Sequence, residues 1–160
     1  MITEPAQPKT VHRNETKLVG YTVTTTLKED MENEIIGSLR ERLLDRRSEI
    51  ASPTDGDGVY LVQLYPDCEW TPDVPFESIV AVEVHTFVPL PEGFVCHTIP
   101  AGAYTKVTHR GPESRIGDTY DWIRDQGLGV IRPFDFEYWA DCGSLEQEES
   151  VIDIYWPIEA

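Results

Sequence analysis

The chain has 160 residues, 29 of them acidic and 13 basic, which gives a formal net charge of −16. This length suits one domain with a buried core and is short for two. Because so strong a negative charge repels phosphate backbones and anionic headgroups, we expect neither nucleic acid nor a membrane surface as a partner. The charge favours cationic ligands or basic protein patches, although it equally suits a soluble surface adapted to salt.

No stretch of the sequence contains the roughly 18 continuous apolar residues that a membrane span needs. The N-terminal segment 1–16 is polar and lacks the apolar core of a signal peptide, so we expect a cytoplasmic protein. Three widely spaced cysteines, Cys68, Cys96 and Cys142, fit reduced thiols better than a disulfide framework. Cysteine and histidine show none of the usual ligand spacings, so we expect no metal and no cofactor.

The first half of the chain predicts a strand, a helix and two further strands. Segment 17–27 is rich in β-branched residues, which is typical of a strand. From about 30 to 50 the apolar residues recur every three or four positions, as on one face of a helix. Segments 59–65 and 79–87 are predicted strands on either side of a proline-containing loop.

The second half repeats this order. We expect a strand at 101–111, a helix at 113–126 and strands at 134–140 and 151–158. Short echoes such as "GYTV" at 20–23 and "AYTK" at 103–106 support two pseudo-repeats, about 17–87 and 94–158, within a single domain of residues 1–160. Two such units predict an α+β fold, an antiparallel sheet with two helices and a central ligand groove.

The stretch "FDFEYWA" places Glu137 among aromatic residues. Strand alternation puts Glu137 and Trp139 on one side of their strand, and Tyr155 opposes the apolar set Ile152 and Ile154 on the last strand. We therefore expect Glu137, Trp139 and Tyr155 to share the sheet face opposite a helix-covered core. Such a mixture suits an amphipathic groove, with a plainly solvated face as the alternative.

Three segments together resemble the GyrI-like domain, which also forms the effector-binding half of bacterial AraC- and MerR-type multidrug-sensing regulators. They are "TIPAGAYTKVTHRGPESRIGDTYDWI", "FDFEYWADCG" and "VIDIYWPIEA". The likeness covers essentially the whole chain, and the first half matches more loosely through "GYTVTTT" and "IVAVEV". The family fold is a duplicated strand–helix–strand–strand unit, in agreement with the internal repeat.

The resemblance implies a pocket between the repeats for bulky aromatic compounds, often cationic. The family's acidic pocket residue matches Glu137, and its tyrosines match Tyr155 and Tyr120. Aromatic character alone adds further candidates: Tyr21, Tyr104, Trp122 and Trp139. A buried carboxylate lacks a partner until a cation arrives, and ring faces attract the charge of that cation.

The sequence contains no helix-turn-helix ahead of this domain, so we expect a free-standing module. It would sense or sequester a small molecule, as in drug resistance. Two alternatives stay open: a hydrolase of the GyrI-like type that uses Glu137 as general acid or base, and a modulator of a protein partner such as DNA gyrase. Both a monomer and a homodimer paired through sheet edges are compatible with the sequence.

Overall fold

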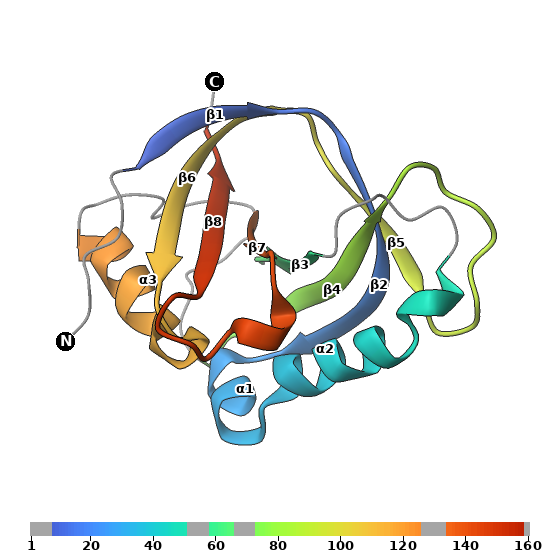
Figure 1. The fold of residues 1–160 in the computed structure, drawn as a ribbon, viewed down its shortest axis with the longest axis horizontal. Coiled ribbons are helices and arrows are strands. Elements are labelled where there is room, and N and C mark those ends of the chain that lie inside the picture. The colour runs from blue at the N-terminus through green and yellow to red at the C-terminus, as the bar shows by residue number, and fades with distance from the viewer. Residues whose placement is uncertain (1–7, 51–57, 66–72, 126–133, 159–160) are drawn as a thin grey trace.

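The computed structural model describes residues 8–50, 58–65, 73–125 and 134–158. Eight strands in these ranges form one curled antiparallel sheet in the order β1-β6-β8-β7-β3-β4-β2-β5, and the helices lie against one of its faces (Figure 1). The predicted α+β class is confirmed. Cys96 and Cys142 are free thiols, and Cys68 lies outside the described residues.

The elements follow one another along the chain in two similar sets. The first set comprises β1 (Lys9–Arg13), β2 (Thr16–Thr25), α1 (Leu27–Asn33), α2 (Ile35–Asp45), β3 (Val59–Leu64) and β4 (Phe76–Val84). The second comprises β5 (Val95–Ile99), β6 (Gly102–Arg110), the 3-10 turn η2 (Glu113–Arg115), α3 (Ile116–Asp125), β7 (Phe134–Trp139) and β8 (Val151–Pro157). Two further 3-10 turns are η1 (Arg47–Glu49) and η3 (Cys142–Ser144).

Each half therefore begins with a short strand that the sequence patterns did not predict. β1 lies inside the polar segment 1–16, and β5 precedes the predicted strand at 101–111. These two strands are exchanged between the halves, because β1 pairs with β6 and β5 pairs with β2. Figure 1 shows β1 running into β2 as an arch over the sheet, with the β5–β6 arch beside it. Five-residue edge strands carry too little alternation to stand out in a sequence.

The single helix predicted from 30 to 50 is wrong in one respect, since it is broken at Glu34. Thr26 caps α1 by accepting a hydrogen bond from the Glu29 amide at 3.0 Å. Glu34 then adopts a left-handed conformation with φ of 51°, and the Asp30 side chain accepts a hydrogen bond from the Ile36 amide at 2.7 Å. The Asp30 side chain thus starts α2 on a new axis, at the cost of an unfavourable backbone conformation.

The expected sharing of one face by Glu137, Trp139 and Tyr155 is also wrong. The register of β7 and β8 pairs Phe136 with Tyr155 and Glu137 with Ile154. Because directly paired residues share a face, Glu137 and Trp139 lie on the helix-covered face and Tyr155 lies on the other. Alternation within each strand was predicted correctly, but the register between two strands cannot be read from alternation alone.

Both faces of the sheet carry a hydrophobic core. The helix-covered core includes Leu39 and Leu43 of α2, Tyr21 of β2 and Trp139 of β7. The opposite face gathers a second cluster, made of Leu18, Tyr60, Val62, Ile79, Ala81, Ile99, Tyr104, Phe136 and Tyr155. Tyr21 and Tyr104, which the repeat of "GYTV" and "AYTK" treated as equivalent, therefore lie in different cores.

None of the helices in the part of the chain that the structure describes is long and apolar enough to cross a membrane.

Candidate functional site

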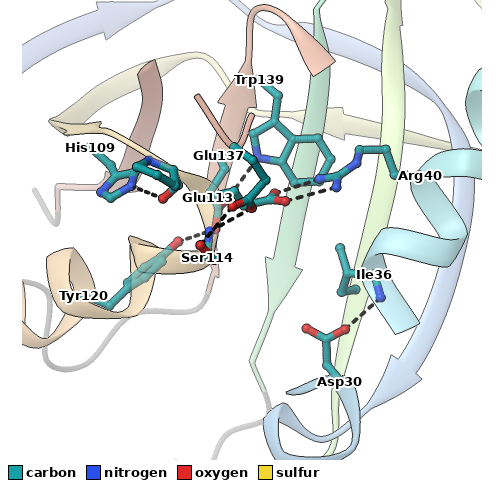
Figure 2. A network of polar contacts seen from close by, with 11 residues as sticks. Asp30, Ile36, Arg40, His109, Glu113, Ser114, Tyr120, Glu137 and Trp139 are labelled. Carbon is teal, nitrogen blue, oxygen red and sulfur yellow. Dashed lines mark hydrogen bonds and ion pairs between the residues drawn. The ribbon is translucent and has the colours of Figure 1, made fainter. Parts of the chain in front are cut away.

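Glu137 lies on β7 beneath the two main helices, where only 5% of its surface is exposed. In Figure 2 Tyr120 approaches it from α3, while Arg40 extends from α2 toward Trp139. The Tyr120 hydroxyl donates to Oε2 of Glu137 at 2.6 Å, and Nε1 of Trp139 donates to Oε1 at 2.9 Å. Both carboxylate oxygens are thus held by neutral donors.

The protonation of Glu137 is strongly affected by this setting. Burial raises the pKa of its carboxyl group from 4.5 to about 7, and the nearby Asp135 charge acts in the same direction. The hydrogen bonds from Tyr120 and Trp139 oppose the rise because they favour the charged form. No described lysine, arginine or histidine forms an ion pair with Glu137. With a pKa of about 7, the carboxyl group lies between its neutral and charged forms. Its direct partners among the described residues are neutral hydrogen-bond donors, and the charge of Arg40 acts on it from nearby.

Tyr120 covers this carboxylate while remaining only partly buried as a residue. Burial of its hydroxyl, followed by the charge of Glu137, raises the pKa of Tyr120 well above the ordinary value of 10. The hydroxyl consequently stays protonated and acts as a donor throughout the physiological range.

Sequence reasoning missed Arg40, which places a cation beside the site. Its guanidinium carbon lies 4.7 Å from the centre of the Trp139 ring. Its two terminal nitrogens bind both carboxylate oxygens of Glu113, at 2.7 and 3.0 Å. This pair joins α2 to the start of the second helical region across the site (Figure 2). A signal was available, since Arg40 follows Ile36 by four positions on the apolar side of α2.

The structure brings only part of the predicted set together. Glu137, Tyr120 and Trp139 form one connected group, whereas Tyr104 and Tyr155 lie on the opposite face of the sheet. The other two predicted residues pack elsewhere. Tyr21 receives a 2.7 Å hydrogen bond from Arg46, and Trp122 of α3 packs against the core beneath its own helix.

His109 has a structural role beside this group. It is fully buried, and its Nε2 lies 2.9 Å from the Pro112 carbonyl oxygen, so Nε2 must carry the proton. Its Nδ1 shares a hydrogen bond of 2.6 Å with the Thr119 hydroxyl, which fixes α3 to β6. Among the residues that the structure describes, no group of three or more potential ligands is arranged to hold a metal ion.

A family model for the GyrI-like small molecule binding domain matches residues 6–159. This chain belongs to the GyrI-like family. The resemblance noted from the sequence is thereby confirmed, and the chain is a small-molecule-binding domain of that kind.

One sequence relative and two solved structures of similar fold illustrate what the chain resembles. The transcriptional regulator BrlR of Pseudomonas aeruginosa is 32% identical over 130 residues, which are 77% of this chain and 46% of the regulator. This chain thus spans about half of that relative. An integron cassette protein from Vibrio cholerae shares the fold with a TM-score of 0.70 at 20% identity over 98% of both chains. SAV2435 bound to tetraphenylphosphonium gives a TM-score of 0.71 at 14% identity, covering 97% of this chain and 95% of the other.

Proposed function

We propose that this domain binds bulky aromatic cations at Glu137, and that it serves to sense or sequester them. The observation that carries the proposal is a carboxylate, 95% buried, that has no ion pair in the described part of the chain. A buried charge is costly until an opposite charge arrives, so an incoming cation gains the interaction that the folded protein lacks.

The surroundings of Glu137 favour a flat and lipophilic cation over a small ion. Trp139 and Tyr120 provide ring surface next to the carboxylate, and Trp139 already carries the Arg40 guanidinium on its face. Ring faces attract diffuse positive charge and stack on a flat body without demanding one shape. The net charge of −16 further draws cations to the protein. SAV2435, which has a similar fold, was solved with tetraphenylphosphonium, a ligand of this chemistry.

Entry of such a ligand requires rearrangement, because Glu137 is covered. We infer that Tyr120 swings away and that its hydrogen bond to Oε2 is replaced by the charge of the ligand. The Arg40–Glu113 pair, which joins the two halves over the site, must move with it or define one wall. The free-energy cost of this opening lowers the affinity of every ligand equally, so the preference for cations comes from the carboxylate interaction alone.

The test is a titration of tetraphenylphosphonium and of neutral triphenylphosphine oxide, followed by calorimetry at about 0.15 M salt, where distant surface charges are largely screened. The pH is set well above the pKa of Glu137, which is about 7, so that its carboxyl group is charged. Glu137→Gln keeps the shape and removes the charge, so it should weaken the cation roughly tenfold to hundredfold, which corresponds to a charged hydrogen bond of about 1–3 kcal/mol. The neutral compound should change little.

Glu41→Gln is the matched control, because Glu41 is exposed on α2 and its replacement changes the net charge equally. It should leave both affinities unchanged. Equal weakening of the cation and the neutral compound by Glu137→Gln, or equal weakening of the cation by both variants, would show that the buried carboxylate does not recognise charge.

A further inference from the structure

Arg40 lies beside the carboxylate of Glu137 without binding it. Its guanidinium carbon is 4.7 Å from the centre of the Trp139 ring, and the same ring donates Nε1 to Oε1 of Glu137 at 2.9 Å. Burial alone lowers the pKa of Arg40, yet the net pKa is raised, first by the hydrogen bonds and the charge of Glu113. The charges of Cys142 and Glu137 add to the rise. Glu137 thus acts on Arg40 through space, although no ion pair within the described ranges joins them.

The guanidinium group is held by Glu113 instead. Nη1 of Arg40 donates to Oε2 of Glu113 at 2.7 Å, and Nη2 donates to Oε1 at 3.0 Å. Two parallel bonds of this kind fix the direction of a guanidinium group as well as its position. Only 17% of the Arg40 side chain and 23% of the Glu113 side chain are exposed, so solvent screens the pair weakly. Figure 2 shows Arg40 reaching from α2 toward the Glu113 and Glu137 carboxylates, of which it binds the first.

The position of Glu113 is fixed through its backbone. Its amide donates to the Leu145 carbonyl oxygen at 2.7 Å, and the carbonyl oxygen of the preceding Pro112 lies 2.9 Å from Nε2 of the buried His109. Arg40, by contrast, extends from the middle of α2 on a long side chain with several rotatable bonds. Glu113 is therefore the fixed member of the pair and Arg40 the movable one, so the charge of Glu113 decides where the guanidinium group points.

Glu137 is the acceptor to which Arg40 would turn if Glu113 lost its charge. The direct partners of Glu137 are two neutral donors, so a positive charge gains more there than at a carboxylate that already has an ion pair. The indole ring of Trp139 contacts both groups and provides a face along which the guanidinium group can move. A Glu137 carboxylate paired with Arg40 would gain little from an external cation, because binding would first have to break an ion pair.

We propose that Glu113 is a positioning residue of the cation site: it holds Arg40 in a two-point ion pair and thereby keeps this internal cation from occupying Glu137. The inference rests on the proposed function of Glu137 and deepens it, because it explains how an arginine so close leaves the carboxylate available to a ligand. A pair that served only to join α2 to η2 would stabilise the fold, and it would act on Glu137 through the charge of Glu113 alone.

The pKa of Glu137, followed by NMR of its carboxyl carbon, tests this assignment without any ligand. In Glu113→Gln the released Arg40 should pair with Glu137 and lower its pKa from about 7 by about one to three pH units. Adding Arg40→Gln should return the pKa close to its unmodified value. Asp135→Asn is the matched control: after burial, the charge of Asp135 does most to raise the pKa of Glu137, and its removal leaves the Arg40–Glu113 pair intact. A fall in Asp135→Asn as large as that in Glu113→Gln would overturn the proposal.

The unmodified chain supplies a measurement that stays valid if Glu113→Gln does not fold. The NMR signals of the Arg40 guanidinium nitrogens should change little while Glu137 loses its proton near pH 7, because Glu113 holds the guanidinium group in both states. Signals that follow this ionisation closely would show that Arg40 is shared with Glu137, and they would refute the positioning role of Glu113.

Calorimetric titration with tetraphenylphosphonium and neutral triphenylphosphine oxide, at a pH where Glu137 is charged, measures the effect on binding. Glu113→Gln should weaken the cation by at least about tenfold and leave the neutral compound unchanged, since the cation must now displace Arg40. Adding Arg40→Gln should restore most of the lost affinity, whereas an equal loss in both variants would overturn the proposal, because the pair would then only hold the helices in place. Failure of the proposed function is recognised separately, because Glu137→Gln would then leave the affinity for the cation unchanged.

Discussion

The buried carboxyl of Glu137 should make the stability of the protein depend on pH in a recognisable way. Its pKa is about 7 in the folded chain against an ordinary value of 4.5, which we take for the unfolded chain. Between these two values the folded state holds a proton that the unfolded state releases. The free energy of unfolding therefore falls as pH rises through this window, by about 1.4 kcal/mol for each pH unit. The total is on the order of 3 kcal/mol over the whole window.

Glu137→Gln removes this dependence, because an amide does not titrate. Urea unfolding of both proteins from pH 4 to pH 8 measures this dependence. The contributions of the many other carboxyl groups cancel in the difference between the two free energies of unfolding. The free energy of unfolding of the variant, relative to that of the unmodified chain, is expected to rise by about 3 kcal/mol from the lowest to the highest pH. A constant penalty at every pH reflects the Trp139 or Tyr120 hydrogen bond that an amide cannot accept. A difference that stays flat between pH 4 and pH 8 would refute the burial argument.

Four further substitutions test the surroundings of the site and the packing of the helices and the sheet. Tyr120→Phe removes a hydrogen bond that lowers the pKa of folded Glu137, so the fall in stability should extend to higher pH while its onset stays in place, as repeated urea titrations will show. Arg40→Gln breaks a partly buried two-point ion pair and should cost about 1–3 kcal/mol in the same urea assay, whereas a loss near zero would mean that solvent already screens the pair. Gly20→Ala would drive a methyl group into the backbone of β4, so it should cost at least about 3 kcal/mol by thermal melting, while Gly37→Ala, which meets no atom within 4 Å, should be neutral or stabilising.

The strands and helices with long periodic patterns could be predicted from the sequence, whereas the pairing of strands could not. Six strands and both helical regions follow from apolar spacing, since each has a core face several residues long. β1 was not predicted, because its five residues alternate weakly and are mostly exposed. The face of Tyr155 relative to Glu137 was wrong because the connection between β7 and β8, which sets their register, has no regular pattern to read.

The candidate site was found in part for a similar reason. Glu137 and Trp139 are two positions apart on one strand, so alternation alone brings them together. Tyr120 came from the family resemblance, and its hydrogen bond to Glu137 is consistent with that match. The contact of Arg13 with aromatic rings could not be predicted, because these rings belong to Tyr60 and Phe136, on strands far along the chain. Tertiary contacts of this range leave no local trace.

The exchange of β1 and β5 between the halves bears on how such a molecule can arise. Each half, if produced alone, would carry a first strand whose natural partner belongs to another copy. Two identical copies would satisfy this need by trading strands, so a single unit is suited to an intertwined homodimer rather than to an independent monomer. Fusing the two copies in one chain removes the concentration dependence of that assembly. It also frees the halves to diverge, so that the exchanged strand of one half ends in Arg13 and that of the other ends in Ile99.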